Sequence, residues 1–353
     1  MGISGVMGRH GTMLQTGIAA AAIFVSASAF LSSVVLAQPI EDVYRGKVVT
    51  ISIGYGPGGG YDLYSRLLAR HIGKHIPGKP TVIPKNEPGA GSFKLANELY
   101  NVSPKDGTAL GMIGESLVIS QVLGDPVAKF VAREFNWIGR MADSDPVMVT
   151  LPGTVATVQE AMTKEVAIGV PGAGSATALN VTAVNGLLGT KFKLISGYEG
   201  SAQIRLALER GEVQGSASTL WRIERDWIRE RKLNTVYQAS LESAPDLPTT
   251  PTLVSLARND DERRLLQFYS SYTTVGRSII APPKVPQDRV AALTAAFAAT
   301  MKDADFRADA EKGKMELRVM SGEQLTALIT DVTGLSGPLL ARAKQISRGD
   351  GGK

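Results

Sequence analysis

Three glycine-rich loops carry the residues best suited to hold a small anion. The first spans residues 54–62 (GYGPGGGYD), and the other two are identical pentapeptides, PGAGS, at 88–92 and 171–175. Each loop follows a predicted strand and opens a predicted helix, whose first backbone N–H groups have no partner inside the helix. Those donors and the positive end of the helix dipole favour an anion, and glycine lets a ligand approach the backbone. The three loops therefore predict capture of a small anionic molecule.

Hydroxyl groups beside these loops add hydrogen-bond donors. Ser92 and Ser175 end the two pentapeptides, and Thr177 follows the second. One helix N-terminus stabilises an anion by only about 0.3–1 kcal/mol at an exposed site, so several must converge in a closed, dry cleft to hold a carboxylate tightly. Asp62 falls in a first helical turn, where an acidic residue also stabilises the helix itself. Ligand contact and helix stabilisation both stay open for Asp62.

The first loop also matches a dinucleotide-binding pattern. Gly54, Gly56 and Gly59 give the G-x-G-x-x-G spacing directly after a strand. However, Pro57 interrupts the pattern, and Glu87 comes later than the acidic residue expected about 20 positions on. An exported dinucleotide-binding oxidoreductase remains the alternative to a carboxylate receptor.

Other chemical motifs are weaker. Residues 73–79 imitate a phosphate loop, but Pro80 replaces the required Ser or Thr. His71 and His75 share a helix face and are predicted to lie at an exposed helix end. The chain has no cysteine, which excludes a thiolate nucleophile, a zinc–thiolate site and disulfides. We therefore predict no metal, no cofactor and no catalytic residues.

Strands and helices alternate along the chain and position these loops. The predicted strands are 48–53, 81–83, 110–113, 147–151, 166–170, 192–195 and 213–216. Strands that alternate with helices predict an α/β fold with parallel sheets covered by helices on both faces. From Pro286 onward the pattern is mostly helical, and residues 321–324 (SGEQ) form a capping box.

Two segments interrupt this alternation and divide the chain. Residues 143–146 and 276–283 are interpreted as segments that pass between two lobes. One lobe would hold residues 38–142 and 277–353, and the other residues 143–276. This division suits the length left after removal of an N-terminal signal, about 315 residues, which is typical of two domains.

The first 37 residues differ from the rest. Residues 17–36 are almost free of charge, and Val35 and Ala37 occupy the small-residue positions of a cleavage site before Gln38. This pattern predicts a cleaved secretory signal peptide over residues 1–37, and the alanine and serine content weakens the alternative of a membrane anchor. Without a cysteine to carry a lipid, the mature protein is predicted to be free in the periplasm.

The overall charge is mildly basic, with a net charge of +5. Such a balance can raise the encounter rate with anions. No block of Lys and Arg is present, and few aromatic residues are interleaved with them, so no nucleic-acid partner is predicted.

Taken in order, the motifs resemble those of one transport family. They are GGGYD (58–62), NEPGAGS (86–92), PKDG (104–107), GAGS (172–175), YEGS (198–201), APDLP (244–248) and APP (281–283). Together they resemble the substrate-binding proteins of tripartite tricarboxylate transporters, the Bug receptors, over nearly the whole mature chain. The resemblance implies a two-lobed periplasmic binding protein of the Venus-flytrap type (type II) with two crossover segments.

The resemblance also implies a function and partners. The expected protein is a monomeric, non-catalytic receptor that captures a small organic acid and presents it to the integral membrane subunits of a transporter. A receptor that serves a signalling partner would use the same closed form, so that alternative stays open.

Carried over residue by residue, the resemblance implies a ligand site. The expected ligand contacts are Gly58, Gly59, Asp62, Gly172, Gly174, Ser175 and Thr177, with Tyr55 as an aromatic wall. Tyr61 fills a position that is commonly small in the family, and Ser218 stands where the family often has an acid that meets an amino group. We include both in the predicted site and expect a ligand without an amine.

Overall fold

The computed structural model describes residues 39–334 and 336–348, so the predicted signal peptide, residues 1–37, lies outside the described residues. The described part of the chain forms a single compact unit. Within it, no helix has both the length and the apolar character needed to cross a membrane.

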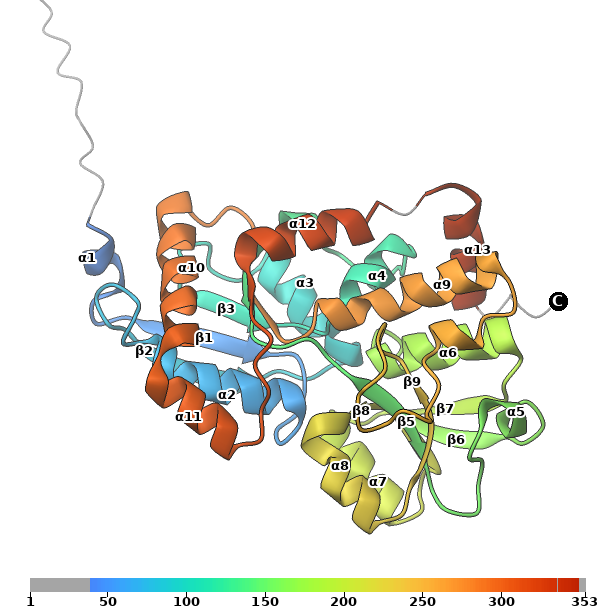
Figure 1. Cartoon of the computed structure of the whole chain (residues 1–353). Helices are drawn as coiled ribbons and strands as arrows, with labels where there is room; N and C mark the ends of the chain where they lie inside the picture. Colours follow the sequence, from blue (N-terminus) through green and yellow to red (C-terminus); the bar gives the residue numbers. More distant parts are fainter. Residues whose placement is uncertain (1–38, 335, 349–353) are drawn as a thin grey trace, which may run out of the picture. The chain divides into compact units, whose positions relative to one another are not determined.

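One sheet has six strands in the order β11-β4-β10-β3-β1-β2 (Figure 1). Its strands are β1 (Val48–Ile53), β2 (Thr81–Asn86), β3 (Ala109–Met112), β4 (Asn136–Arg140), β10 (Ser278–Ala281) and β11 (Met320–Ser321). The helices that precede, connect or follow them are α1 (Ile40–Tyr44), α2 (Gly60–Ile72), α3 (Phe93–Asn101), α4 (Leu117–Val122), α10 (Gln287–Lys302), α11 (Ala304–Lys312) and α12 (Gly322–Val332). Figure 1 shows α2, α10 and α11 gathered beside β1 and β2.

The other sheet has five strands in the order β7-β6-β8-β5-β9. Its strands are β5 (Pro146–Thr150), β6 (Val166–Val170), β7 (Phe192–Ser196), β8 (Gly215–Leu220) and β9 (Asn234–Gln238). The accompanying helices are α5 (Val158–Ala161), α6 (Ala176–Leu188), α7 (Ser201–Glu209), α8 (Trp221–Glu230), α9 (Asp260–Ser270) and α13 (Gly337–Ser347). Short 3₁₀ turns lie at η1 (Ala90–Ser92), η2 (Ala132–Glu134), η3 (Val254–Leu256) and η4 (Ser271–Thr274).

The α/β class is confirmed, but the sheets are mixed rather than purely parallel. Strand β1 runs parallel to β2 and β3, whereas β10 is antiparallel to β3 and β4. In the second sheet β5 is antiparallel to β8 and β9. Strand β11 is also antiparallel to β4. Of the three reversed strands, β5 follows the first predicted crossover and β10 lies within the second. Strand β5 begins the second sheet and β10 returns the chain to the first sheet, and each runs antiparallel to the strands beside it.

The strand membership of the two sheets follows the predicted lobe ranges, with one helix crossing over. Helix α13 belongs by sequence to the predicted range 277–353, yet it packs on α6 and α9 of the second sheet. Tyr269 in α9 donates a hydrogen bond from its hydroxyl to the Ala343 carbonyl at 2.7 Å. The lobe boundaries themselves stay a prediction.

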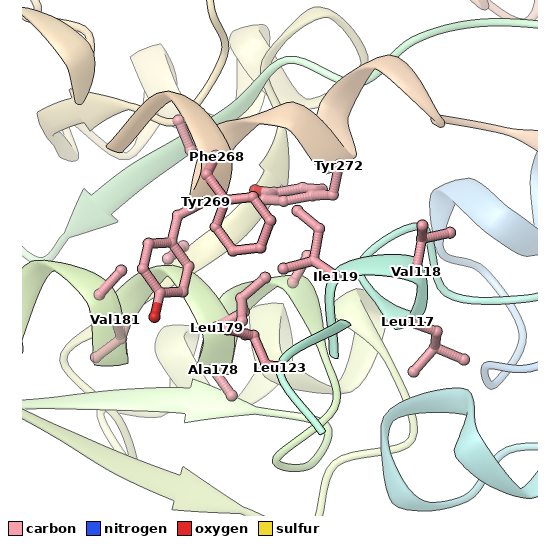
Figure 2. Packing of buried hydrophobic residues seen from close by; sticks show 14 of the residues in the cluster. Leu117, Val118, Ile119, Leu123, Ala178, Leu179, Val181, Phe268, Tyr269 and Tyr272 are labelled. Atoms are coloured by element: carbon pink, nitrogen blue, oxygen red, sulfur yellow. The ribbon is translucent and has the colours of Figure 1, made fainter. Parts of the chain in front are cut away.

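Apolar packing fixes α2 and α6, two of the three helices that begin at the glycine-rich loops. Figure 2 shows α4, α6, α9 and η4 meeting through side chains that include Ile119, Leu179, Phe268 and Tyr272. A second cluster joins α2, α10 and α11 to β1 and contains Leu67. Each buried aliphatic or aromatic side chain contributes roughly 1.5–3 kcal/mol, so both helices are firmly held.

The two histidines hold α2 to α11. His71 Nε2 lies 2.9 Å from Asp309 Oδ2, and His75 Nε2 lies 2.8 Å from Asp303 Oδ2. The side chain of His71 is only 11% exposed, so the prediction of an exposed helix end was wrong. Among the described residues, no group of three His, Asp or Glu side chains is arranged to hold a metal ion.

The first crossover contains a carboxyl group with a raised pKa. Asp145 precedes β5, and its Oδ2 accepts a hydrogen bond from Arg222 Nε at 2.9 Å. Burial raises the pKa of Asp145 from 3.8 to about 6, although the Arg222 guanidinium opposes the change. A group whose pKa rises on folding stabilises the protein fully below its unfolded pKa, and this contribution is lost as pH rises through the folded pKa.

We expect Asp145→Asn to remove this pH dependence. From about pH 4 to about pH 7, the unfolding free energy of the wild type should fall relative to that of the variant by on the order of 2–3 kcal/mol. Urea unfolding of both proteins across this range measures the difference. A difference that stays flat or rises with pH would contradict the assignment.

Candidate functional site

A small cavity lies where the glycine-rich loops of the two sheets meet. It is lined by the first residues of α2, α6 and α7, by Tyr55, and by the charged side chains of Glu115 and Arg277. The cavity leaves about 40 Å³ for the centres of water molecules. One water needs about 10–15 Å³ by this measure, so the space corresponds to on the order of three waters.

The two PGAGS copies adopt different backbone conformations. In the first copy, Ala90, Gly91 and Ser92 all have positive φ, at 50°, 66° and 80°. The Ser92 hydroxyl does not cap α3 and instead accepts a hydrogen bond from the Gly114 N–H at 3.0 Å. In the second copy, the Ser175 hydroxyl caps α6 by accepting from the Ala178 N–H at 3.3 Å. Only the second copy is therefore a capped helix N-terminus.

The two copies also touch each other, backbone against backbone. A Cβ on Gly91 would lie 2.6 Å from the Ser175 nitrogen, and a Cβ on Gly172 would lie 2.9 Å from the Gly91 nitrogen. A Cβ on Gly174 would lie 2.1 Å from the ring of Phe93. The glycines at these positions thus allow close contact between loops of the two sheets. Their role here is contact between protein segments.

Two helix N-termini at the cavity lack a side-chain cap. Helix α2 begins after Gly59 and helix α7 after Gly200, and neither glycine can supply a capping side chain. The loops before them are joined by a hydrogen bond from the Gly56 N–H to the Glu199 carbonyl at 2.8 Å. Helix α6, in contrast, is capped by its own Ser175. The uncapped ends of α2 and α7 therefore present backbone donors and positive partial charge to the cavity.

An aromatic and cationic stack forms one wall. The rings of Tyr55 and Tyr61 stack with centroids 4.4 Å apart, and the guanidinium carbon of Arg277 lies 4.1 Å from the Tyr61 ring centroid. The Tyr61 hydroxyl accepts a hydrogen bond from the Glu115 N–H at 3.1 Å. Burial raises the pKa of both tyrosines well above 10, so the phenols stay neutral.

Arg277 and Glu115 form a buried ion pair at the cavity. Arg277 Nη1 donates to Glu115 Oε2 at 2.7 Å, and both side chains are only 4% exposed. The Ser144 hydroxyl donates to the same oxygen at 2.8 Å. Burial raises the pKa of Glu115, and the adjacent guanidinium opposes that rise. The paired geometry favours the charged form of both groups.

Two polar atoms at the cavity have no hydrogen-bond partner within residues 39–334 and 336–348. They are the hydroxyl oxygen of Thr177, a fully buried residue, and the Nε of Arg277. A buried polar atom without a partner costs about 1–3 kcal/mol, so such atoms are rare in native proteins and call for an explanation. Both atoms belong to residues that line the cavity, where a ligand can reach them.

The sequence-predicted site residues divide into two groups. Those that line the cavity are Tyr55, Gly59, Tyr61, Ser175 and Thr177. Those that lie in the same loops without lining it are Gly58, Asp62, Gly172 and Gly174. Ser218 lies in β8, of which only the backbone is described at that position. The ligand contacts of all ten residues stay predictions.

Asp62 is occupied by protein partners. Its carboxylate accepts hydrogen bonds from the Gly58 N–H at 2.9 Å, from Arg66 Nε at 2.8 Å and from Asn86 Nδ2 at 2.9 Å. Burial opposes ionisation, but these three donors outweigh it and lower the pKa of Asp62. Of the two roles left open by the sequence, ligand contact and helix stabilisation, this geometry favours the structural one, since all three donors belong to the protein, in the preceding loop, α2 and β2.

Sequence reasoning missed the ion pair. Glu115 follows β3, and Arg277 lies in the segment that had been interpreted only as a crossover. The available signal was a single charge, Arg277, in the otherwise uncharged run 275–283 (VGRSIIAPP). Charged residues are almost never fully buried unless they are paired, and the partner of Arg277 is 162 positions away along the chain.

Two mixed sheets joined by crossover strands, with a cavity where their loops meet, define a two-lobed periplasmic binding protein. A family model described as "Tripartite tricarboxylate transporter family receptor" matches residues 65–344. The chain belongs to this family. It is a solute-binding protein of the periplasmic type and not an enzyme, which removes the oxidoreductase alternative.

One relative resembles this chain in sequence, and several solved structures share its fold. A Cupriavidus necator protein, described as "UPF0065 protein in gbd 5'region", is 25% identical over 319 residues, covering 87% of this chain and 90% of that protein. The periplasmic binding protein BugD has a TM-score of 0.67 at 18% identity, over 87% of this chain and 99% of BugD.

Two further structures share the fold and contain ligands. MatC from Rhodopseudomonas palustris, with bound malate, has a TM-score of 0.65 at 17% identity, over 85% of this chain and 99% of MatC. A second R. palustris protein, with adipate, has a TM-score of 0.65 at 17% identity, over 86% of this chain and 97% of that chain.

Proposed function

We propose that this protein captures a small organic acid in the periplasm and delivers it to the integral membrane subunits of a tripartite tricarboxylate-type transporter. One observation carries the proposal: two uncapped helix N-termini and two unpartnered polar atoms face the same small cavity. Each is a feature that an anionic oxygen would satisfy. The malate and adipate bound by proteins of the same fold support a carboxylate ligand.

The proposal assigns roles to the predicted residues. The ends of α2 and α7, at Gly59 and Gly200, would donate backbone hydrogen bonds to the ligand. Thr177 would donate from its hydroxyl, and Tyr55 and Tyr61 would form an apolar wall. Export through the predicted signal peptide would place a free, monomeric receptor in the periplasm, where relatives of its class act.

A thermal-shift screen of the exported protein tests ligand capture. The panel contains aliphatic monocarboxylates, di- and tricarboxylates, aromatic acids, amino acids and NAD. We expect at least one carboxylate to raise the melting temperature, since a ligand at 100 times its Kd stabilises the folded state by about 2.7 kcal/mol. If NAD alone stabilises the protein, the proposal is wrong.

Delivery to a transporter needs a separate experiment. Uptake of the radiolabelled acid that scores in the screen is compared in cells with and without the gene for this protein. We expect uptake to fall on deletion and to return with the wild-type gene. Unchanged uptake with intact binding would point to a receptor that serves a signalling partner.

A further inference from the structure

The side-chain charges at the cavity cancel, so the partial charges of the helix ends are the charges that remain for a ligand. Arg277 and Glu115 are the two charged side chains that line the cavity in the described part of the chain, and they form one neutral pair. Each helix N-terminus carries a partial charge of roughly +0.5. The uncapped ends of α2 and α7 together thus supply a positive charge of about one unit. This balance matches one carboxylate and leaves a second carboxylate without a counter-charge.

The unpartnered atoms give the position of that carboxylate. Glu115 is bound by Arg277 Nη1, whereas Nε has no partner among the described residues, and a Cβ on Gly60 would lie 3.5 Å from Nε. Arg277 Nε is therefore close to the first residue of α2. Thr177 lies in the first turn of α6, on the side of the cavity that belongs to the second sheet. A carboxylate between them would satisfy one unpartnered donor from each sheet and lie at the end of α2.

Apart from Ser175 and the start of α7 at Gly200 and Ser201, the remaining walls of the cavity are apolar. Pro146, Pro171, Ala176 and Leu220 line the cavity with the two tyrosine rings. The cavity is small, with about 40 Å³ of space for the centres of water molecules, which favours a short acid over a long one. These apolar walls can cover a short carbon chain. The end of α7 at Gly200 and Ser201 offers only a partial positive charge, which is not enough to balance a second carboxylate.

We propose that the ligand is a short monocarboxylic acid of about two to four carbons, whose carboxylate is held by Arg277 Nε, the Thr177 hydroxyl and the N-terminus of α2. Glu115 is the specificity residue: it neutralises Arg277 and so limits the cavity to one negative charge. This inference rests on the proposed capture of an organic acid and narrows it to one chemical class.

Calorimetric titration of matched acids tests the class. Propionate is compared with malonate, and butyrate with succinate, so that carbon number is constant within each pair; acetate, lactate, pyruvate, malate and adipate complete the series. We expect the monocarboxylate to bind at least tenfold more tightly in both pairs. Tighter binding of the dicarboxylates overturns the inference while leaving the proposed function intact. If no acid in the wider screen binds, the proposed function itself fails.

Glu115→Gln tests the charge argument. The amide oxygen can still accept from Arg277 and Ser144, but the site gains one positive charge. We expect the affinity for succinate relative to butyrate to rise at least tenfold. Glu224→Gln is the control, since Glu224 is a mostly buried carboxyl paired with Arg205 away from the cavity. Burial raises the pKa of Glu224 to about 7, so the comparison is made at about pH 8, where it is mostly ionised.

Thr177→Val keeps the inference testable if Glu115→Gln does not fold. Valine has the shape of threonine without the hydroxyl, which has no partner in the described protein, so the ligand-free melting temperature should stay the same or rise. The affinity for the best monocarboxylate should fall at least fivefold. Thr300→Val, which removes a buried hydroxyl from α10 that bonds to the Ala296 carbonyl, should leave affinity unchanged. Unchanged affinity in Thr177→Val, or an unchanged acid preference in Glu115→Gln, overturns the inference.

Discussion

Replacing Glu115 with leucine is expected to lower the free energy of unfolding by about 3–5 kcal/mol. The Arg277 guanidinium would stay buried and charged, since arginine is not deprotonated in proteins, and it would lose the carboxylate that lies 2.7 Å away. Arg277→Met should lower the free energy of unfolding by less at acidic pH than at neutral pH. Burial raises the pKa of Glu115, so this carboxyl can take up a proton and become neutral when Arg277 is absent.

The double variant Glu115→Leu/Arg277→Met separates the pair from its surroundings. Buried ion pairs are often replaced by apolar residues of similar volume at little cost, so we expect the double variant to recover most of the lost stability. It should nevertheless bind no carboxylate. Urea unfolding of the wild type and the three variants gives the coupling energy directly. If Glu115→Leu lowers the free energy of unfolding by less than about 1 kcal/mol, the Glu115–Arg277 ion pair behaves like a solvent-exposed pair and is not buried as described.

Replacing Gly174 with valine is expected to abolish measurable ligand binding while the protein still folds. The backbone of Gly174 does not have positive φ, so valine meets no conformational barrier there. Its Cβ, however, would lie 2.1 Å from the buried ring of Phe93, which begins α3. Overpacking of this kind costs about 1–3 kcal/mol and displaces neighbouring segments. Here these are the two PGAGS loops, of which the second lines the cavity through Pro171 and Ser175.

Gly211→Ala is the matched control for Gly174→Val. Gly211 has a φ of +72° and open space where a Cβ would lie, so alanine adds backbone strain without a contact. It follows the C-terminal end of α7, opposite the end that lines the cavity. We expect a comparable loss of stability, about 1–2 kcal/mol, with unchanged affinity. Unchanged affinity in Gly174→Val as well would remove loop 171–175 from the site.

The pattern of neighbouring residues was sufficient to predict many of the strands and helix ends. Strands Val48–Ile53 and Val166–Val170 begin and end where predicted, because both are rich in Val and Ile and each is followed at once by a turn residue, Gly54 or Pro171. The capping box was also confirmed: the Ser321 hydroxyl accepts from the Gln324 N–H while the Gln324 side chain accepts from the Ser321 N–H. Such features depend on residues a few positions apart, which a single sequence displays directly.

Features that depend on distant partners could not be predicted. Strands β4 and β9 were missed because Asn136–Arg140 and Asn234–Gln238 begin and end with polar residues. The direction of β5 and β10 depends on which sheet each strand enters. The two PGAGS copies have the same letters but different conformations, because their neighbours determine the backbone. Likewise, nothing near Arg277 in sequence reveals Glu115.

The contact between the two PGAGS loops also determines where this receptor can vary. Every single-base change that alters a glycine codon adds a side chain or ends the chain, and Gly91 and Gly172 have no room even for a methyl group. Neither glycine can therefore be replaced without displacing the backbone of the other loop. Thr177, Tyr61 and Leu220 line the cavity without forming that contact. Substitutions that change ligand preference are therefore expected in the cavity wall, while the contact between the two loops stays constant.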